Sequence, residues 1–248
     1  MKSIRKAGEA LRALAAPPHE ITVGDLARVL GVTASNASRI LAELREVGLV
    51  EQDPGTRRYR PGPTAAGLAA GARPPASLLS VVEEEMATLV PRTRHTAWAG
   101  VLDGADVVAL STRHGGYPVR FGVDLGRRLP AHAAAMGKAL LALMPDEVVK
   151  RILPARLARH ADKTLTRRDV LLADLATTRS RGYAISDEEL FPGIKSVAVA
   201  FASRGEDPAV ALSVSFPLAS LRPEGEEKAV TEALLESARA IRRRIGRA

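Results

Sequence analysis

The sequence predicts an α+β protein in which a small helical domain precedes a larger domain on an antiparallel sheet. Three observations predict it. The 248 residues exceed one average domain. Apolar residues repeat at helical spacing over the first fifty residues, whereas later runs alternate and are joined by turn residues. Residues 61–75 are rich in proline, glycine and alanine. We therefore expect domains at 1–62 and 76–248, joined by a linker helix or hinge at 63–75.

The composition excludes several classes of protein. With 46% hydrophobic and 26% charged residues, the chain can bury an ordinary globular core. The absence of cysteine excludes disulfides, thiolate nucleophiles and cysteine-based zinc sites. No apolar run approaches the roughly 18 residues of a membrane span, and the first residues lack the apolar core of a signal peptide. We therefore expect a cytoplasmic chain with no membrane partner.

The net charge of +8 is concentrated in two segments. Residues 1–62 carry ten Lys/Arg against seven Asp/Glu, and the residues after Glu236 carry five arginines and no acid. Cations at the end of a last helix suit the negative end of its dipole. Contact between this tail and DNA is the alternative interpretation.

Three short helices are predicted in the first domain. Thr22 is a candidate N-cap with Asp25 three positions later, and Gly31 ends that helix. Thr33 is a candidate cap for the next helix. The first helix has one apolar face and is stopped by Pro17 and Pro18; the third has an apolar stripe. These two faces consist of Ile4, Ala7, Ala10, Leu11 and Leu14, and of Ala37, Ile40, Leu41, Leu44 and Val47.

The third predicted helix opens with small polar residues opposite its apolar stripe. Two short helices joined by a glycine turn, the second with a polar start, are typical of a helix-turn-helix whose second helix enters the major groove. Short polar side chains and an arginine suit base edges and phosphates. The candidate contacts are Thr33, Ser35, Asn36, Ser38 and Arg39.

Residues 49–60 predict a two-stranded wing. The turn at residues 53–56 divides two short strands, of which the second is basic. Arg57, Arg58 and Arg60 are therefore candidate phosphate contacts. A small helical bundle with a solvated polar face is the alternative, but it explains the helices and leaves the basic hairpin unexplained. We expect a winged helix-turn-helix that binds double-stranded DNA.

The second domain reads as helices interleaved with hairpin strands. A helix over residues 77–89 precedes strands at 96–101 and 107–110, which the Asp103-Gly104 turn divides. An extended piece at 117–123 leads to a helix over 131–144. Strands at 197–202 and 210–216 and a last helix from about 223 to 244 follow. Hairpin-linked strands indicate an antiparallel sheet.

Two long segments of this domain resemble the hallmark segments of the IclR (isocitrate lyase regulator) family of bacterial transcription regulators. They are LPAHAAAMGKALLA at residues 129–142 and RGYAISDEELFPGI at 181–194. The resemblance covers essentially the whole chain. It implies a winged helix-turn-helix, a linker helix and a GAF/PAS-like effector domain, assembled as a homodimer or homotetramer on a palindromic operator.

The resemblance also implies a pocket for a small organic acid or aromatic catabolite. Its lining would be Phe121, Leu129, Ala135, Met136, Ser186, Asp187, Ser196, Ser213 and Ser215. The predicted helix start after Pro130 offers backbone N–H groups to a carboxylate, and Ser213 and Ser215 share one sheet face. Hydroxyl-to-backbone bonding in a core strand is the alternative role for this serine pair. Many members have cysteine at Ser196 and proline at Ala200, so a named effector does not transfer.

No motif supports catalysis, a cofactor or a metal. The five histidines are scattered without ligand spacing, and Met136-Gly137-Lys138-Ala139 lacks the first glycine and the Ser/Thr of a P-loop. The consecutive acids Asp187, Glu188 and Glu189 read as a solvated or capping cluster. We expect a ligand-responsive transcription regulator, most simply a repressor. The alternatives are a ligand-independent architectural DNA-binding protein and an enzyme domain fused to a DNA-binding module.

Overall fold

The computed structural model describes residues 2–15, 18–71, 78–117, 124–202, 208–220 and 225–246. The chain divides into two compact units, residues 1–74 and 75–248. Each unit has its own buried apolar core and is described separately below.

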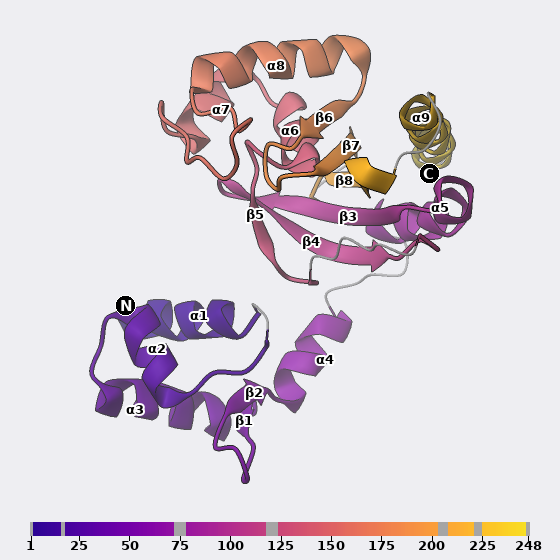
Figure 1. Ribbon diagram of the computed structural model, residues 1–248. Helices are drawn as coiled ribbons and strands as arrows, with labels where there is room; N and C mark the ends of the chain where they lie inside the picture. Colours follow the sequence, from indigo (N-terminus) through magenta and orange to yellow (C-terminus); the bar gives the residue numbers. More distant parts are fainter. Residues whose placement is uncertain are drawn as a thin grey trace. The chain divides into compact units, whose positions relative to one another are not determined.

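The described residues of the first unit form three helices, a hairpin and a fourth helix (Figure 1). The helices are α1 (Lys2–Ala15), α2 (Val23–Leu30) and α3 (Ala34–Glu46). The hairpin pairs β1 (Val50–Gln52) with β2 (Tyr59–Pro61) antiparallel, and α4 (Pro63–Gly71) follows it. The predicted helix-turn-helix and two-stranded wing are therefore confirmed. The predicted linker helix is α4; the rest of the predicted linker lies outside the described residues.

Local hydrogen bonds explain where α2 begins and ends. The Thr22 hydroxyl accepts from the Asp25 backbone N–H at 3.1 Å, and the Asp25 carboxylate accepts from the Thr22 N–H at 3.2 Å. This reciprocal pair is the predicted capping box, and the bonds from Thr22 hold the pKa of Asp25 below its ordinary value. Gly31 ends α2 with a φ of 60°, which glycine adopts without strain.

The core of the first unit follows the predicted apolar faces except at their ends. Ala10, Leu14 and Leu41 are fully buried, but Ile4 is 81% exposed and Val47 is 58% exposed. Ile4 lies in the first turn of α1, before the residues that contact the core, and Val47 is the cap that follows the last residue of α3. The predicted apolar stripes were therefore one residue too long at these two ends.

In the second unit, the residues that the structure describes form a six-stranded sheet. Its strands are β3 (Thr96–Asp103), β4 (Asp106–Arg113), β5 (Arg128–Pro130), β6 (Ala184–Asp187), β7 (Ile194–Phe201) and β8 (Val210–Pro217). They lie in the order β5-β4-β3-β8-β7-β6, and each neighbouring pair is antiparallel. The predicted antiparallel α+β architecture is confirmed.

Helices cover both faces of this sheet (Figure 1). On one face, α5 (Leu78–Thr93) and α9 (Glu226–Ile245) pack on the larger apolar cluster. On the other, α6 (Ala135–Ala142) packs directly on the sheet, and α7 (Asp146–Ile152) and α8 (Arg168–Arg181) pack against α6. A short 3-10 helix spans Leu218–Ser220.

The alternation of side chains along β8 determines what each face contains. Val210, Leu212 and Val214 point toward α5 and α9. Because successive residues of a strand point to opposite faces, Ser213 and Ser215 point toward α6. The α6 face of the sheet therefore carries small polar side chains in an otherwise apolar layer.

The predicted helix over residues 131–144 is shorter in the structure. It begins at Ala135, because residues 131–134 form a tight turn in which the Ala133 and Ala134 N–H groups both bond to the Pro130 carbonyl. Gly137 lies against this turn: a Cβ at that position would sit 2.3 Å from the Cα of Ala131. The helix start is therefore set by packing against the turn.

Candidate functional site

Helix α3 has one buried and one polar, exposed side. Ala37, Leu41 and Leu44 are buried in the core of the first unit. The predicted contacts Ser35, Asn36, Ser38 and Arg39 are all exposed. Thr33 caps the helix by accepting from the Asn36 N–H at 3.3 Å, so part of its hydrogen-bonding capacity serves the fold. The helix start thus presents short polar groups and the positive end of a dipole to solvent.

Arg39 extends from α3 into solvent. Its side chain is 74% exposed, and its Nε lies 3.9 Å from Glu43 Oε1, one turn along the same helix. An exposed pair at this distance contributes little to stability. Arg39 can therefore turn toward a base edge or a phosphate at small cost.

A hydrogen-bonded turn shapes the hairpin loop. Asp53 Oδ1 accepts from the Gly55 N–H at 3.0 Å and from the Thr56 N–H at 2.7 Å, and these bonds, that of Thr56 first, hold the pKa of Asp53 low. Arg57 then takes a φ of 60°, and its N–H donates to the Asp53 carbonyl at 2.9 Å. The turn fixes the backbone from which the wing arginines project.

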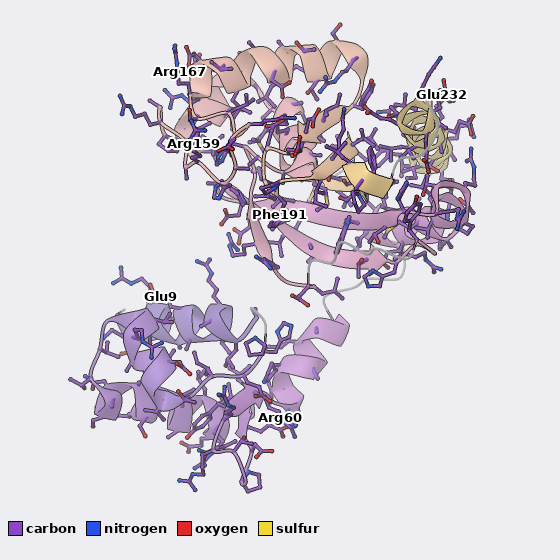
Figure 2. The ribbon with its side chains drawn as sticks, viewed as in Figure 1. Glu9, Arg60, Arg159, Arg167, Phe191 and Glu232 are labelled. Carbon is purple, nitrogen blue, oxygen red and sulfur yellow. The ribbon has the colours of Figure 1, made fainter. Side chains whose placement is uncertain are left out.

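The three wing arginines differ in whether an acidic side chain lies near them. Arg58 Nε lies 3.9 Å from Glu20 Oε2, and Arg60 Nε donates to Glu51 Oε1 at 2.7 Å across the hairpin shown in Figure 2. No ion pair within the described ranges involves Arg57, which is exposed. Only Arg60 belongs to the second strand, since Arg57 and Arg58 precede it in the loop. The hairpin therefore presents Arg57 as its most available cation.

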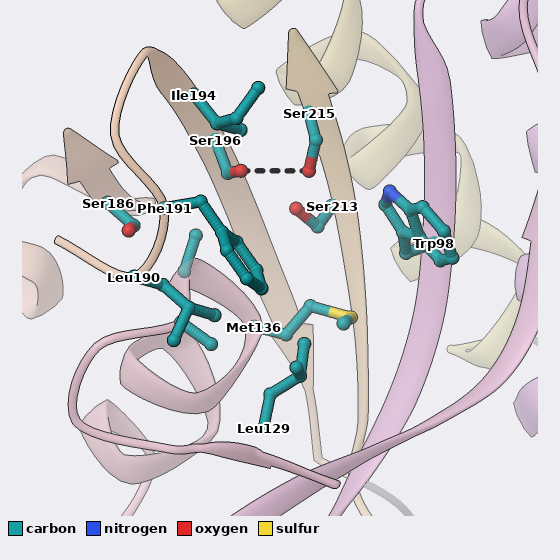
Figure 3. A pocket seen from close by; sticks show the side chains of 12 residues that line it. Trp98, Leu129, Met136, Ser186, Leu190, Phe191, Ile194, Ser196, Ser213 and Ser215 are labelled. Carbon is teal, nitrogen blue, oxygen red and sulfur yellow. Dashed lines mark hydrogen bonds between the residues drawn. The ribbon is translucent and has the colours of Figure 1, made fainter. Parts of the chain in front are cut away.

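The second unit contains a cavity between α6 and the sheet (Figure 3). The cavity has a volume of about 30 Å³ and is bordered by β3, β5, β6, β7, β8, the start of α6 and the loop that follows β6. Its lining consists of Trp98, Leu129, Ala134, Ala135, Met136, Ser186, Leu190, Phe191, Ile194, Ser196, Ser213 and Ser215. The hallmark segments at 129–142 and 181–194 thus meet around one hollow.

Most of the predicted pocket residues come together at this cavity. Leu129, Ala135, Met136 and the four serines line it, whereas Phe121 lies outside the described residues. Asp187 is not part of the lining and this prediction was wrong. It follows Ser186 on β6 and therefore points to the opposite face, where its carboxylate lies 3.2 Å from Lys195 Nζ and 3.6 Å from Lys163 Nζ.

The serine hydroxyls are partly engaged within the protein. Ser186 donates to the Ala133 carbonyl at 2.7 Å, which links β6 to the turn before α6. Ser196 and Ser215 share a hydrogen bond of 2.8 Å across neighbouring strands, drawn as a dashed line in Figure 3. Structural bonding therefore accounts for Ser186, while the Ser196–Ser215 pair retains one hydroxyl hydrogen for another acceptor.

Five lining residues were not predicted. Leu190, Phe191 and Ile194 belong to the second hallmark segment, whose length already signalled them. Ala134 lies in the turn before α6. Trp98 had no sequence signal beyond its strand: it points toward the cavity while Ala97 and Ala99 point away. Its indole Nε1 is buried and has no hydrogen-bond partner among the described residues.

A buried ion cluster holds the loop that closes the cavity. Lys138 of α6 is 1% exposed, and its Nζ lies 2.7 Å from Glu189 Oε1 and 2.9 Å from Asp174 Oδ2. Burial raises the pKa of Glu189, and the charge of Lys138 opposes that rise. The prediction of a solvated or capping acidic cluster was wrong for Glu189, which is 8% exposed. Because Glu189 precedes Leu190 and Phe191, the ion pair ties the cavity wall to α6.

Two family domains match this chain. The domain described as "IclR helix-turn-helix domain" matches residues 3–54, and "Bacterial transcriptional regulator IclR C-terminal" matches residues 75–243. The chain belongs to the IclR family. It is therefore a transcriptional regulator with a DNA-binding helix-turn-helix and a C-terminal effector-binding domain, rather than an enzyme.

Relatives of this IclR-family regulator match along most of its length. The HTH-type transcriptional regulator BhcR of Paracoccus denitrificans is 32% identical over 222 residues, covering 89% of this chain and 79% of the relative. The transcriptional repressor IclR of Escherichia coli is 26% identical, with 89% and 82% covered. A crystal structure of an IclR homologue from Microbacterium hydrocarbonoxydans, complexed with 4-hydroxybenzoate, is 25% identical, with 95% and 98% covered and a TM-score of 0.75.

Neither a cluster of metal-ligating side chains nor a membrane-spanning helix is present among the regulator's described residues. No three His, Asp or Glu side chains in that part of the chain are grouped as a metal ion would require. None of the helices present there is long and apolar enough to cross a bilayer.

Acid should weaken the fold of the effector domain through His132. Burial lowers the pKa of His132 below its ordinary value of about 6.5, and its Nε2 contacts the Ala158 carbonyl at 2.9 Å. The folded state therefore binds fewer protons than the unfolded state, so this contribution to stability is present above pH 6.5 and is lost as pH falls below it.

We expect the unfolding free energy to fall between pH 7.5 and 5.5, and to fall less in His132→Gln, which keeps an N–H donor and cannot titrate. Urea unfolding followed by tryptophan fluorescence at both pH values measures this. Equal losses in the two proteins would contradict the assignment to His132.

Proposed function

We propose that this IclR-family regulator binds a palindromic operator as a homodimer or homotetramer in the cytoplasm and represses transcription. A small organic acid or aromatic catabolite in the cavity between α6 and the sheet would change its operator affinity. The observation that carries the proposal is the exposed polar start of α3 beside the cationic hairpin.

The start of α3 and the hairpin arginines would contact different parts of the DNA. The start of α3, with Ser35, Asn36 and Arg39, meets base edges in the major groove. Arg57, with Arg58 and Arg60 beside it, contacts phosphates, which adds affinity without reading sequence. A symmetric dimer would place two copies of α3 one helical turn of DNA apart, and a palindromic operator matches that symmetry.

The effector part rests on the chemistry of the cavity. Ala134 gives α6 no side-chain cap, so the first backbone N–H groups of this helix remain available to an anion. Leu129, Met136 and Phe191 supply apolar walls. These walls must move apart for a small carbon skeleton to enter, because a cavity of about 30 Å³ has room for roughly one water molecule. The complex of the Microbacterium homologue with 4-hydroxybenzoate supports a ligand of this kind.

Gel shifts on DNA upstream of the protein's own gene, at several salt concentrations, test the DNA part. Arg39→Ala should weaken specific binding by about 1 to 3 kcal/mol if Arg39 reads a base. Arg57→Ala should weaken binding to every sequence alike and reduce the salt slope by about one. Arg151→Ala, which removes an exposed arginine from α7, is the matched control and should change neither. No specific retardation of this DNA by the wild-type protein would refute the operator assignment.

A thermal-shift screen of aromatic and aliphatic carboxylates, followed by calorimetric titration, tests the effector part. A ligand of the native state raises apparent stability. By linkage, an effector must also change operator affinity. Saturable binding of an acid that shifts operator affinity excludes a ligand-independent architectural protein. Binding without such a shift would leave the acid without a regulatory role.

A further inference from the structure

We infer that the Trp98 indole N–H is a recognition point of the cavity, and that the ligand is a carboxylic acid carrying a second hydrogen-bond acceptor on an apolar skeleton. This inference rests on the proposed effector function and narrows the ligand class. Trp98 lies on β3, outside both hallmark segments.

The indole group of Trp98 is buried and lines the cavity. Trp98 is 2% exposed, and none of the residues that the structure describes bonds to its Nε1. A buried N–H without an acceptor is unfavourable, because folding removes it from water and gives nothing in return. Figure 3 shows the nitrogen on the side of the ring that faces Ser213 and Ser215. The donor therefore points into the polar end of the cavity.

Serine hydroxyls lie near this indole N–H donor. Ser213 lies directly opposite Trp98 in the β3–β8 register, and Ser215 is already bonded to Ser196. An indole N–H donates only, whereas a serine hydroxyl can donate or accept. A hydroxyl or carbonyl oxygen on the ligand satisfies all of these groups. An ammonium group has no lone pair and would leave the indole N–H unpaired.

Apolar side chains separate two polar regions of the cavity, the start of α6 and the group formed by Trp98 and the serines. The uncapped start of α6, at Ala135 and Met136, offers backbone N–H groups from a different element of the fold. In Figure 3, the ring of Phe191 and the side chain of Met136 lie between the α6 backbone and the serines of β7 and β8. A carboxylate at α6 and a second acceptor at Trp98 thus define the ligand as an acid with a short apolar body.

The experiment compares matched acids on the full chain. The probes are 4-hydroxybenzoate against benzoate and 4-oxopentanoate against pentanoate, titrated into the wild-type protein and into Trp98→Phe. Trp98 is the single tryptophan, so indole ¹⁵N labelling gives one N–H resonance that reports this bond alone. We expect the acceptor-bearing acid to bind roughly five- to tenfold more tightly in at least one pair. We expect Trp98→Phe to abolish that preference, and the indole resonance to move downfield only with the acceptor-bearing acid.

The outcomes separate this inference from the proposed function. If acids bind with equal affinity within each pair, or the indole resonance stays in place at saturation, the role of Trp98 is overturned and acid sensing stands. If none of the four acids binds, the effector assignment and the inference fall together. The resonance needs no variant, so the test remains decisive even if Trp98→Phe does not fold.

Discussion

Lys138→Met should lower the free energy of unfolding of the effector domain by about 3 to 5 kcal/mol. Lys138 is 1% exposed and lies within 3 Å of two carboxylates, Glu189 at 2.7 Å and Asp174 at 2.9 Å. Methionine fills similar space but removes the cation that pairs with Glu189, whereas Asp174 keeps Arg181 at 4.0 Å. Because Glu189 is buried, its carboxylate is then left in an apolar environment without a counter-charge. For a domain of this size, the midpoint of thermal unfolding should fall by roughly 10 °C.

Three comparisons make the Lys138 prediction specific. Lys150→Met removes an exposed lysine that pairs with Glu147, and it should change stability by less than about 0.5 kcal/mol. Adding Glu189→Gln to Lys138→Met should recover part of the loss. The loss should also shrink at low pH, since the buried carboxyl with its raised pKa can then take a proton. Fluorescence of Trp98 reports unfolding of this unit, and a loss below about 1 kcal/mol would contradict the prediction.

Gly137→Ala should destabilise the same unit by roughly 3 kcal/mol, although alanine normally favours a helix over glycine by about 1 kcal/mol. The added Cβ would lie 2.3 Å from both the Cα and the carbonyl oxygen of Ala131. These are backbone atoms of the tight turn that precedes α6, so the turn must move. Because that turn carries Ala134 and accepts the Ser186 hydroxyl bond, the cavity should lose its shape along with the stability.

Gly116→Ala is the matched control for Gly137→Ala. It lies in the same unit, and nothing comes within 4 Å of the position that its Cβ would take. Thermal unfolding followed by fluorescence should separate the two variants by several degrees, and acid binding should persist in Gly116→Ala alone. Unchanged or increased stability of Gly137→Ala would show that the turn yields easily.

The sequence alone predicted features that depend on near neighbours. Thr22, Asp25 and Gly31 define α2 through bonds within four residues, and the Asp103-Gly104 turn places β3 beside β4. The polar and apolar sides of α3 follow from helical periodicity, which can be read directly from the sequence. Seven of the nine pocket residues that the family resemblance implied line the cavity, and four of them lie in the two hallmark segments.

The tertiary structure decided the features that depend on distant partners. Alternation along β6 turned Asp187 toward Lys163 and Lys195, and packing against Gly137 moved the start of α6 to Ala135. Lys138 and Glu189 are 51 positions apart, and the sequence alone gave no sign that the fold buries them together as an ion pair. The position of the Trp98 indole beside Ser213 depends on the pairing of β3 with β8, which the sequence does not show. Local hydrogen bonds join residues that are close in the sequence, so the sequence predicts them. Burial and charge pairing depend on contacts between distant residues, which form only when the chain folds.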